Sequence, residues 1–272
     1  MKKLIREWKY KMYYLYLFGY TIKSKIMYRM TFLIDVISAL LTCFIQTSLW
    51  QALLTGNYMS GLAFEVMVPY VIITYFSATL THINIAVVIE NSIRDGSILY
   101  NLIKPVNYRR YLLSGMVGEN TFKACINTLI IFIASIFVYG FYIPKSFLCV
   151  LGFVISLFLG VMLMFEITYV CGLSAFWLQR TWFIDWFLEA FVIFFGGSAV
   201  PLWFYPEILQ RISIILPFRY VSYEAINIYL GHYNMEVCIA KILISIFWII
   251  VLRTAGAVMW KHAQKRVEIN GG

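Results

Sequence analysis

The chain has 272 residues, of which 62% are hydrophobic and only 13% are charged. A soluble domain is typically about 45–50% apolar and about 25% charged, so this composition excludes an ordinary water-soluble protein and indicates a membrane protein. The formal net charge of +9 is attributed to basic loops on the cytoplasmic side and to anionic lipid headgroups, and we expect no nucleic-acid partner.

Residues 1–30 predict a helix that lies in the plane of the lipid headgroups. Leu4, Trp8, Met12 and Leu15 recur at helical spacing, while lysines, arginines and tyrosines occupy the other faces. Such a helix is either a plain membrane anchor or an elbow that slides in the interface and braces the first span. The pattern does not separate these two roles.

Apolar runs of about 20 residues predict membrane-spanning helices. Lysine and arginine are concentrated before the first run, after the second, and after the last. By the positive-inside rule both termini face the cytoplasm, which requires an even number of spans. We therefore predict a single all-α integral membrane domain over residues 1–272, with six spans at 31–54, 67–89, 121–140, 147–178, 186–204 and 241–260.

Charged residues at membrane depth are costly and are candidates for function. Glu166 is the deepest of them, and it is either a packed, hydrogen-bonded group or a residue of a transport cavity. Asp35, Asp185 and Arg253 are expected to pair with nearby groups of opposite charge. Glu119 and Glu189 complete the set.

A short helix is predicted in the cytoplasmic loop between the second and third spans. The loop, residues 94–113, reads RDGSILYNLIKPVNYRRYLL. Ser92 and Asp95 have the spacing of a capping box. Residues 96–105 then predict about two helical turns, which Pro105 ends.

This short helix carries an apolar patch. Leu99, Leu102 and Ile103 fall on one side of it, with Tyr100 nearby. A two-turn helix is marginal in water without tertiary contacts, so we expect either the span ends of the same protein or a partner to hold it. A simple interfacial loop with basic flanks remains an equal alternative.

An interrupted apolar segment precedes the last span. Residues 196–231 read GGSAVPLWFYPEILQRISIILPFRYVSYEAINIYLG, and three prolines prevent one continuous helix. We predict short helices at 206–216 and 220–230, within a re-entrant segment over 205–231 that dips into the outer leaflet and caps a central cavity. An ordinary outer loop with interfacial helices is the alternative.

Motifs of known enzymes are absent. The chain has no GxxxxGK[ST] loop, no HExxH and no GxSxG, and its five cysteines form no CxxC pair. No residue pattern therefore supports a catalytic site or a cofactor bound by this chain, and an integral-membrane enzyme is an alternative that no polar cluster favours.

Two of these stretches resemble the permease subunits of type-2 ABC exporters, in the single-domain, six-span branch. GSILYNLIKPVNYRRYLL is similar to that family's loop of a glycine, an apolar pair, L-x-x-P-V and Y-L-L. The sequence of 196–231 resembles the family's outer hairpin, and the resemblance covers essentially the whole chain. Glu224 and Ala225 stand where a nearby proline is expected, which affects the expected shape of the last short helix.

The resemblance implies an exporter in the bacterial cell membrane. Two permeases, as a homodimer or a heterodimer, would sit above two cytoplasmic ABC ATPase subunits that bind ATP and Mg, and the cargo would be amphipathic or hydrophobic: a drug, antibiotic, peptide or lipid. The short helix would be the coupling helix that docks on the ATPase, with Arg94, Gly96, Leu99, Leu102, Ile103, Lys104 and Pro105 as its residues. The outer gate would include Gly196, Gly197, Pro201, Pro206, Pro217 and Phe218.

The rival interpretation is a secondary transporter or channel that works without ATP. It would depend on an acidic residue within the membrane, such as Glu166.

Overall fold

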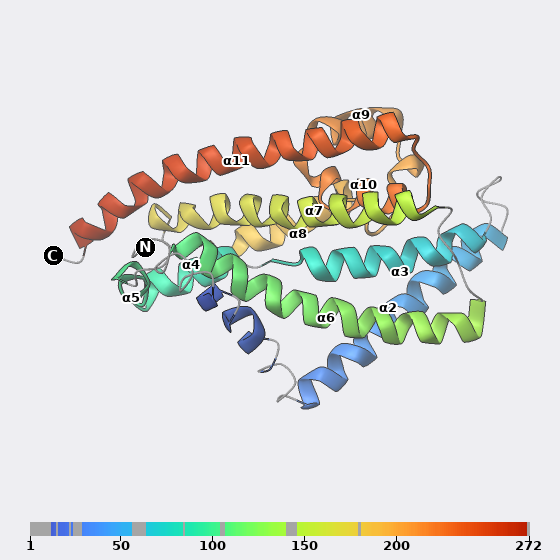
Figure 1. Ribbon diagram of the computed structural model, residues 1–272, viewed down its shortest axis with the longest axis horizontal. Coiled ribbons are helices and arrows are strands. Elements are labelled where there is room, and N and C mark those ends of the chain that lie inside the picture. The colour runs from blue at the N-terminus through green and yellow to red at the C-terminus, as the bar shows by residue number, and fades with distance from the viewer. Residues whose placement is uncertain are drawn as a thin grey trace.

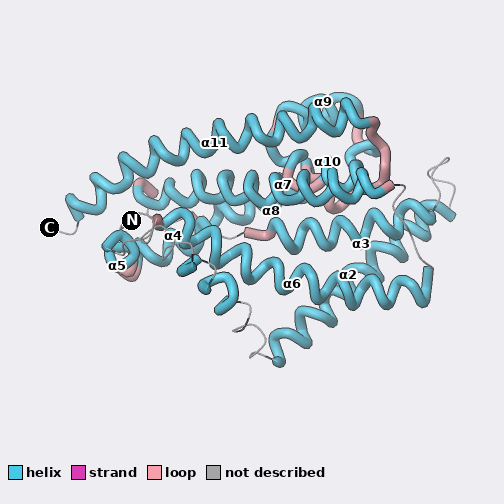
Figure 2. The backbone as a smooth tube through the Cα atoms, in the orientation of Figure 1, coloured by secondary structure: helices cyan, strands magenta, loops and turns pink. Residues whose placement is uncertain are grey.

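The computed structural model of the protein describes residues 12–14, 16–21, 23, 29–55, 64–83, 85–103, 107–139, 146–178 and 181–270. The described residues are almost entirely helical and contain no strand (Figure 2), which confirms the predicted all-α class. Five of the described helices are long and apolar enough to cross a membrane. Most of them run along the long axis of the molecule, and α2 crosses them obliquely (Figure 1).

The first predicted span is one helix in the structure, whereas the second is divided into two. The first corresponds to α2, Arg29–Thr55. The second, 67–89, consists of two helices, α3 (Phe64–Thr81) and α4 (Ile85–Arg94), with a non-helical stretch between them. An apolar run does not reveal such a break, because hydropathy reports burial and not backbone continuity.

The backbone carbonyls freed by the break after α3 accept hydrogen bonds from a side chain of α6. Asn120, which is 7% exposed, donates through Nδ2 to Leu80 O at 3.3 Å and to His82 O. Backbone carbonyls at membrane depth need protein partners, because lipid offers none. The Asn120 amide therefore makes an interrupted span tolerable at this point.

The middle helices are longer than the apolar runs that predicted them. α6 covers Tyr108–Tyr139 against a predicted 121–140, because its first half carries charged residues that a search for apolar runs excludes. α7 covers Phe147–Leu173, and a 3-10 turn at Ser174–Phe176 extends it nearly to the predicted end at 178. Ser146 caps α7 by accepting a hydrogen bond from Leu148 N at 3.1 Å.

The predicted fifth span, 186–204, is not one helix. α8 covers Trp182–Phe195, which is 14 residues. At 1.5 Å per residue it is about 21 Å long, shorter than a hydrocarbon core of about 30 Å. The described helices therefore do not confirm a sixth full span. The chain turns at Gly197, whose φ of +67° suits a residue without Cβ.

The interrupted segment forms short helices, as its prolines predicted. α9 covers Glu207–Ile215 and α10 covers Tyr223–Tyr229, with a 3-10 turn at Pro217–Tyr220 between them. These elements gather at one end of the molecule, opposite α4 and the short helix α5, Ile98–Ile103 (Figure 1). α11, Met235–Asn270, runs back along the whole bundle and exceeds the predicted span of 241–260 at both ends.

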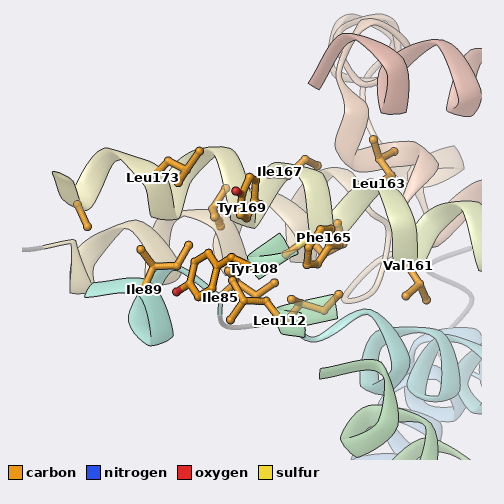
Figure 3. Packing of buried hydrophobic residues seen from close by; sticks show 14 of the residues in the cluster. Ile85, Ile89, Tyr108, Leu112, Val161, Leu163, Phe165, Ile167, Tyr169 and Leu173 are labelled. Atoms are coloured by element: carbon orange, nitrogen blue, oxygen red, sulfur yellow. The ribbon is translucent and has the colours of Figure 1, made fainter. Parts of the chain in front are cut away.

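α7 is the centre of the packing, in contact with α11, α10 and α4. Figure 3 shows side chains of α4 and α6, including Ile89 and Tyr108, beneath the α7 residues Phe165 and Tyr169. A Cβ added at Gly172 would lie 2.9 Å from Ala86 Cα, so the glycine allows α4 to approach α7 closely.

The predicted interfacial helix over 1–30 is described only in part. Residues 12–14, 16–21 and 23 are helical, and the other residues before 29 lie outside the described part of the chain. The described portion contacts α6, where a Cβ added at Gly118 would lie 3.0 Å from Phe18 O.

Candidate functional site

The loop that carries α5 is built by a turn around two residues. The Asp95 side chain accepts a hydrogen bond from Ser97 N at 2.9 Å, and Gly96 has a φ of +74°. Hydrogen bonds from Ser97 lower the pKa of the Asp95 carboxyl below its usual value. The predicted capping box is wrong: Ser92 lies inside α4 and donates to Val88 O at 2.7 Å. Asp95 alone caps the turn.

α5 spans six residues, Ile98–Ile103, which is shorter than the predicted 96–105. Ile98 is 3% exposed and anchors the helix in the core, whereas Leu99, Tyr100 and Ile103 are 44%, 73% and 80% exposed. Lys104, Pro105 and the side chain of Leu102 lie outside the described residues. The apolar patch predicted on this helix is thus partly described, and its described members face outward.

Local hydrogen bonds flank α5 on both sides, and one further bond joins the loop to the N-terminal segment. Before it, the exposed Arg94 donates to Asn91 Oδ1 at 2.9 Å within α4. After it, Asn107 Oδ1 accepts from Arg110 N at 3.1 Å and caps the first turn of α6. Asn107 N in turn donates to Tyr14 OH at 3.0 Å. A displacement of α5 would therefore act on α4, on α6 and on the N-terminal segment together.

Glu166 was predicted to be either a packed group or a cavity residue. It lies on α7 and is 3% exposed. Its carboxylate forms an ion pair with Arg109, near the start of α6. The Arg109 guanidinium also lies 5.7 Å from the ring centres of both Phe165 and Tyr169. This buried pair joins the beginning of α6, just after the α5 loop, to the middle of α7.

The predicted gate glycines hold α8 against its neighbours. Tyr70 OH of α3 donates to Gly197 O at 2.5 Å, and Ser222 Oγ donates to Gly196 O at 3.1 Å. Phe218 stacks on a ring of α8, with 5.3 Å between the ring centres. The three prolines stand at boundaries: Pro201 before a 3-10 turn, Pro206 before α9, and Pro217 at the start of the next 3-10 turn.

A buried charge cluster in the interrupted segment over 196–231, the outer segment of the predicted topology, was not predicted. Glu224, fully buried in α10, pairs with Arg219 and lies 3.1 Å from Lys241 Nζ of α11. Burial lowers the pKa of Arg219, but the charge and hydrogen bond of Glu224 outweigh it and raise that pKa above its usual value. The sequence offered only the unusual glutamate in an apolar segment as a signal, because Lys241 belongs to another helix and the pattern does not show that Arg219, five residues away, turns toward Glu224.

Comparison with known proteins identifies the chain's relatives. The family described as "ABC-2 family transporter protein" matches residues 52–271, which is most of the chain. The chain belongs to this family. No curated protein matches it at the level of similarity required. The matched range begins at the end of α2 and includes α5, the Arg109–Glu166 pair and the outer segment.

As an ABC-2 family member the protein is a multi-pass membrane protein and a transport component of an ABC transporter. Permeases of this family normally work with ATPase subunits. The α5 loop and the outer segment therefore lie at opposite ends of a membrane permease (Figure 1).

Proposed function

We propose that the protein is the permease subunit of an ATP-driven exporter and that α5 is the contact for a separate ATPase. The observation that carries the proposal is the exposure of Leu99, Tyr100 and Ile103 on a helix whose other side is anchored by the buried Ile98. A helix of six residues is not stable alone, so its anchored position and outward apolar side fit a docking element.

The other subunits of the proposed transporter are inferred together with this contact. ATP and Mg would be bound by two cytoplasmic ATPase subunits, and this chain would contribute no catalytic group. A second permease, identical or related, would complete the pathway. Both termini and α5 would face the cytoplasm of a bacterial cell, which agrees with the basic residues near them, such as Arg94 and Lys265.

Movement of α5 would reach the membrane through rigid connections. Asn107 joins the loop to α6, and the Arg109–Glu166 pair joins α6 to α7. α7 contacts α10 directly, and Gly160 allows the backbone of Val221 to approach it closely. ATP-driven closure of the ATPase pair would thus move the outer segment. The segment would open as a gate for amphipathic or hydrophobic cargo.

The proposal is tested by placing a charge on α5. The permease is co-expressed and co-purified with a candidate ABC ATPase, as wild type and as Leu99→Asp and Ile103→Asp. Because a buried carboxylate in an apolar contact is strongly unfavourable, we expect co-purification to weaken at least about tenfold and permease-dependent ATP hydrolysis to fall with it.

The matched control is Ile208→Asp. Ile208 is 72% exposed on α9, at the other end of the molecule, so it resembles Ile103 in exposure but not in place. Assembly should survive this change. Intact assembly in all three variants would refute the docking role of α5, and transport by the permease without any ATPase would favour a secondary transporter or channel instead.

A further inference from the structure

A cavity of about 610 Å³ lies between α2, α3 and α6, apart from the α5 loop and the outer segment. Lys123, at the midpoint of α6, lies 3.3 Å from Asp35 of α2 and 4.0 Å from Glu119. These side chains are only about one-third exposed, at 30%, 32% and 35%. Glu119 and Lys123 lie near the middle of α6 and Asp35 lies near the start of α2; ionisable groups on membrane-spanning helices are costly in lipid, which makes a functional role the first hypothesis.

The cavity also holds a buried amide with poor hydrogen bonding. Asn127 lines it and is 4% exposed. Among the described residues its amide makes one hydrogen bond, to Tyr75 OH at 3.5 Å, which is the limit of acceptable geometry. Buried amides are normally well satisfied, so an occupant with polar atoms fits this position.

An apolar cavity of about 270 Å³ continues along the same three helices. Ile131 lines it one helical turn after Asn127, and Cys43 lines it directly after Thr42 of the polar cavity. The seam between α2, α3 and α6 is therefore charged and polar at one end and apolar at the other. The apolar cavity of about 270 Å³, lined mainly by aliphatic and aromatic side chains, suits an alkyl chain.

We propose that this seam binds a single-chain amphiphile whose head carries an ammonium group, and that this amphiphile is cargo of the permease. Asp35, Glu119 and Lys123 carry a formal net charge of −1, from two carboxylates and one ammonium. A cationic head can share the two carboxylates with Lys123, whereas an anionic head would be repelled by both at low dielectric constant. The cavity volume is in the range that small-molecule sites occupy, about 300–1,000 Å³.

Only the role as cargo rests on the proposed function. Binding itself is a property of this chain and is measured without an ATPase. The probes are dodecylamine, dodecanol and dodecanoate, which share one chain and differ in the head. Their binding to the purified full-length permease is counted by native mass spectrometry, and we expect the amine to bind at least about tenfold more tightly than the carboxylate.

Substitutions that remove a negative or a positive charge should change amine binding in opposite directions, which distinguishes a specific site from general destabilisation. Asp35→Asn and Glu119→Gln should each weaken binding of the amine about tenfold, while Lys123→Gln should strengthen it. Ala134→Phe, which fills the apolar cavity, should weaken all three probes. Glu207→Gln is the matched control, because that carboxylate is 78% exposed on α9 and should leave binding unchanged.

Equal binding of the three probes, or effects of Asp35→Asn and Lys123→Gln in the same direction, would overturn the site. Binding of the amine should survive Leu99→Asp, which tests the ATPase contact separately. With the ATPase present, dodecylamine should stimulate ATP hydrolysis at least about twofold in wild type and not in Glu119→Gln. Tight binding without any stimulation would overturn its assignment as cargo.

Discussion

Neutralising Glu224 tests whether the outer segment depends on its buried charges. In Glu224→Gln, the side chain keeps its shape but leaves Arg219 and Lys241 without their carboxylate. Those two side chains are 11% and 17% exposed, so water replaces little of the lost interaction. Removing one partner of a buried ion pair typically costs about 3–5 kcal/mol, and we expect about 3 kcal/mol here, because the amide still accepts one hydrogen bond.

The assay is thermal unfolding of the purified permease in detergent. At about 2–4 °C per kcal/mol for a chain of this size, the apparent Tm should fall by about 6–12 °C. The control is Glu207→Gln, which breaks an exposed pair with Arg211 at 2.6 Å in the same segment. An exposed pair contributes about 0–1 kcal/mol, so its Tm should shift by no more than about 4 °C. Equal shifts in the two variants would refute the reasoning that burial makes the Glu224 cluster important.

Three further outcomes are expected. Gly160→Ala should lower Tm by several degrees, because the added Cβ would overlap the backbone carbonyl of Val221, just before α10. Gly115→Ala is the control: its added Cβ meets no neighbouring atom within 4 Å, so the change should be neutral or slightly stabilising in its helix. Equal Tm shifts in the two variants would contradict this packing. Trp50→Ala, which empties a site that is 2% exposed, should cost about 3–5 kcal/mol, measured as the largest Tm loss among single truncations in α2. In a cysteine-free background, Tyr100→Cys should react with a membrane-impermeant maleimide only from the cytoplasmic side, and Ile208→Cys only from outside. Labelling of both cysteines from the same side would contradict the proposed orientation.

Much of the architecture could be predicted from the sequence, because hydrophobic length and loop composition are local properties. The apolar runs located α2 to within two residues at each end and α7 at its start, although α7 ends five residues before the predicted 178, since each is a continuous stretch of lipid-compatible side chains. The prolines of 196–231 located α9 and α10 for an equally local reason: proline cannot continue a helix. The exposed apolar side of α5 also followed from its own few residues.

The tertiary structure alone decided what depends on distant partners. The second span can break at 82–83 because Asn120 of α6 satisfies its carbonyls, and no pattern within 67–89 contains that amide. Glu166 is buried and paired with Arg109, which comes from the start of another helix, and no pattern around Glu166 contains that partner. The same holds for Lys241 beside Glu224 and for Asp35 beside Lys123, which come from other helices. A charge at membrane depth is visible in the sequence, but its partner, and therefore its role, is set by how the helices pack.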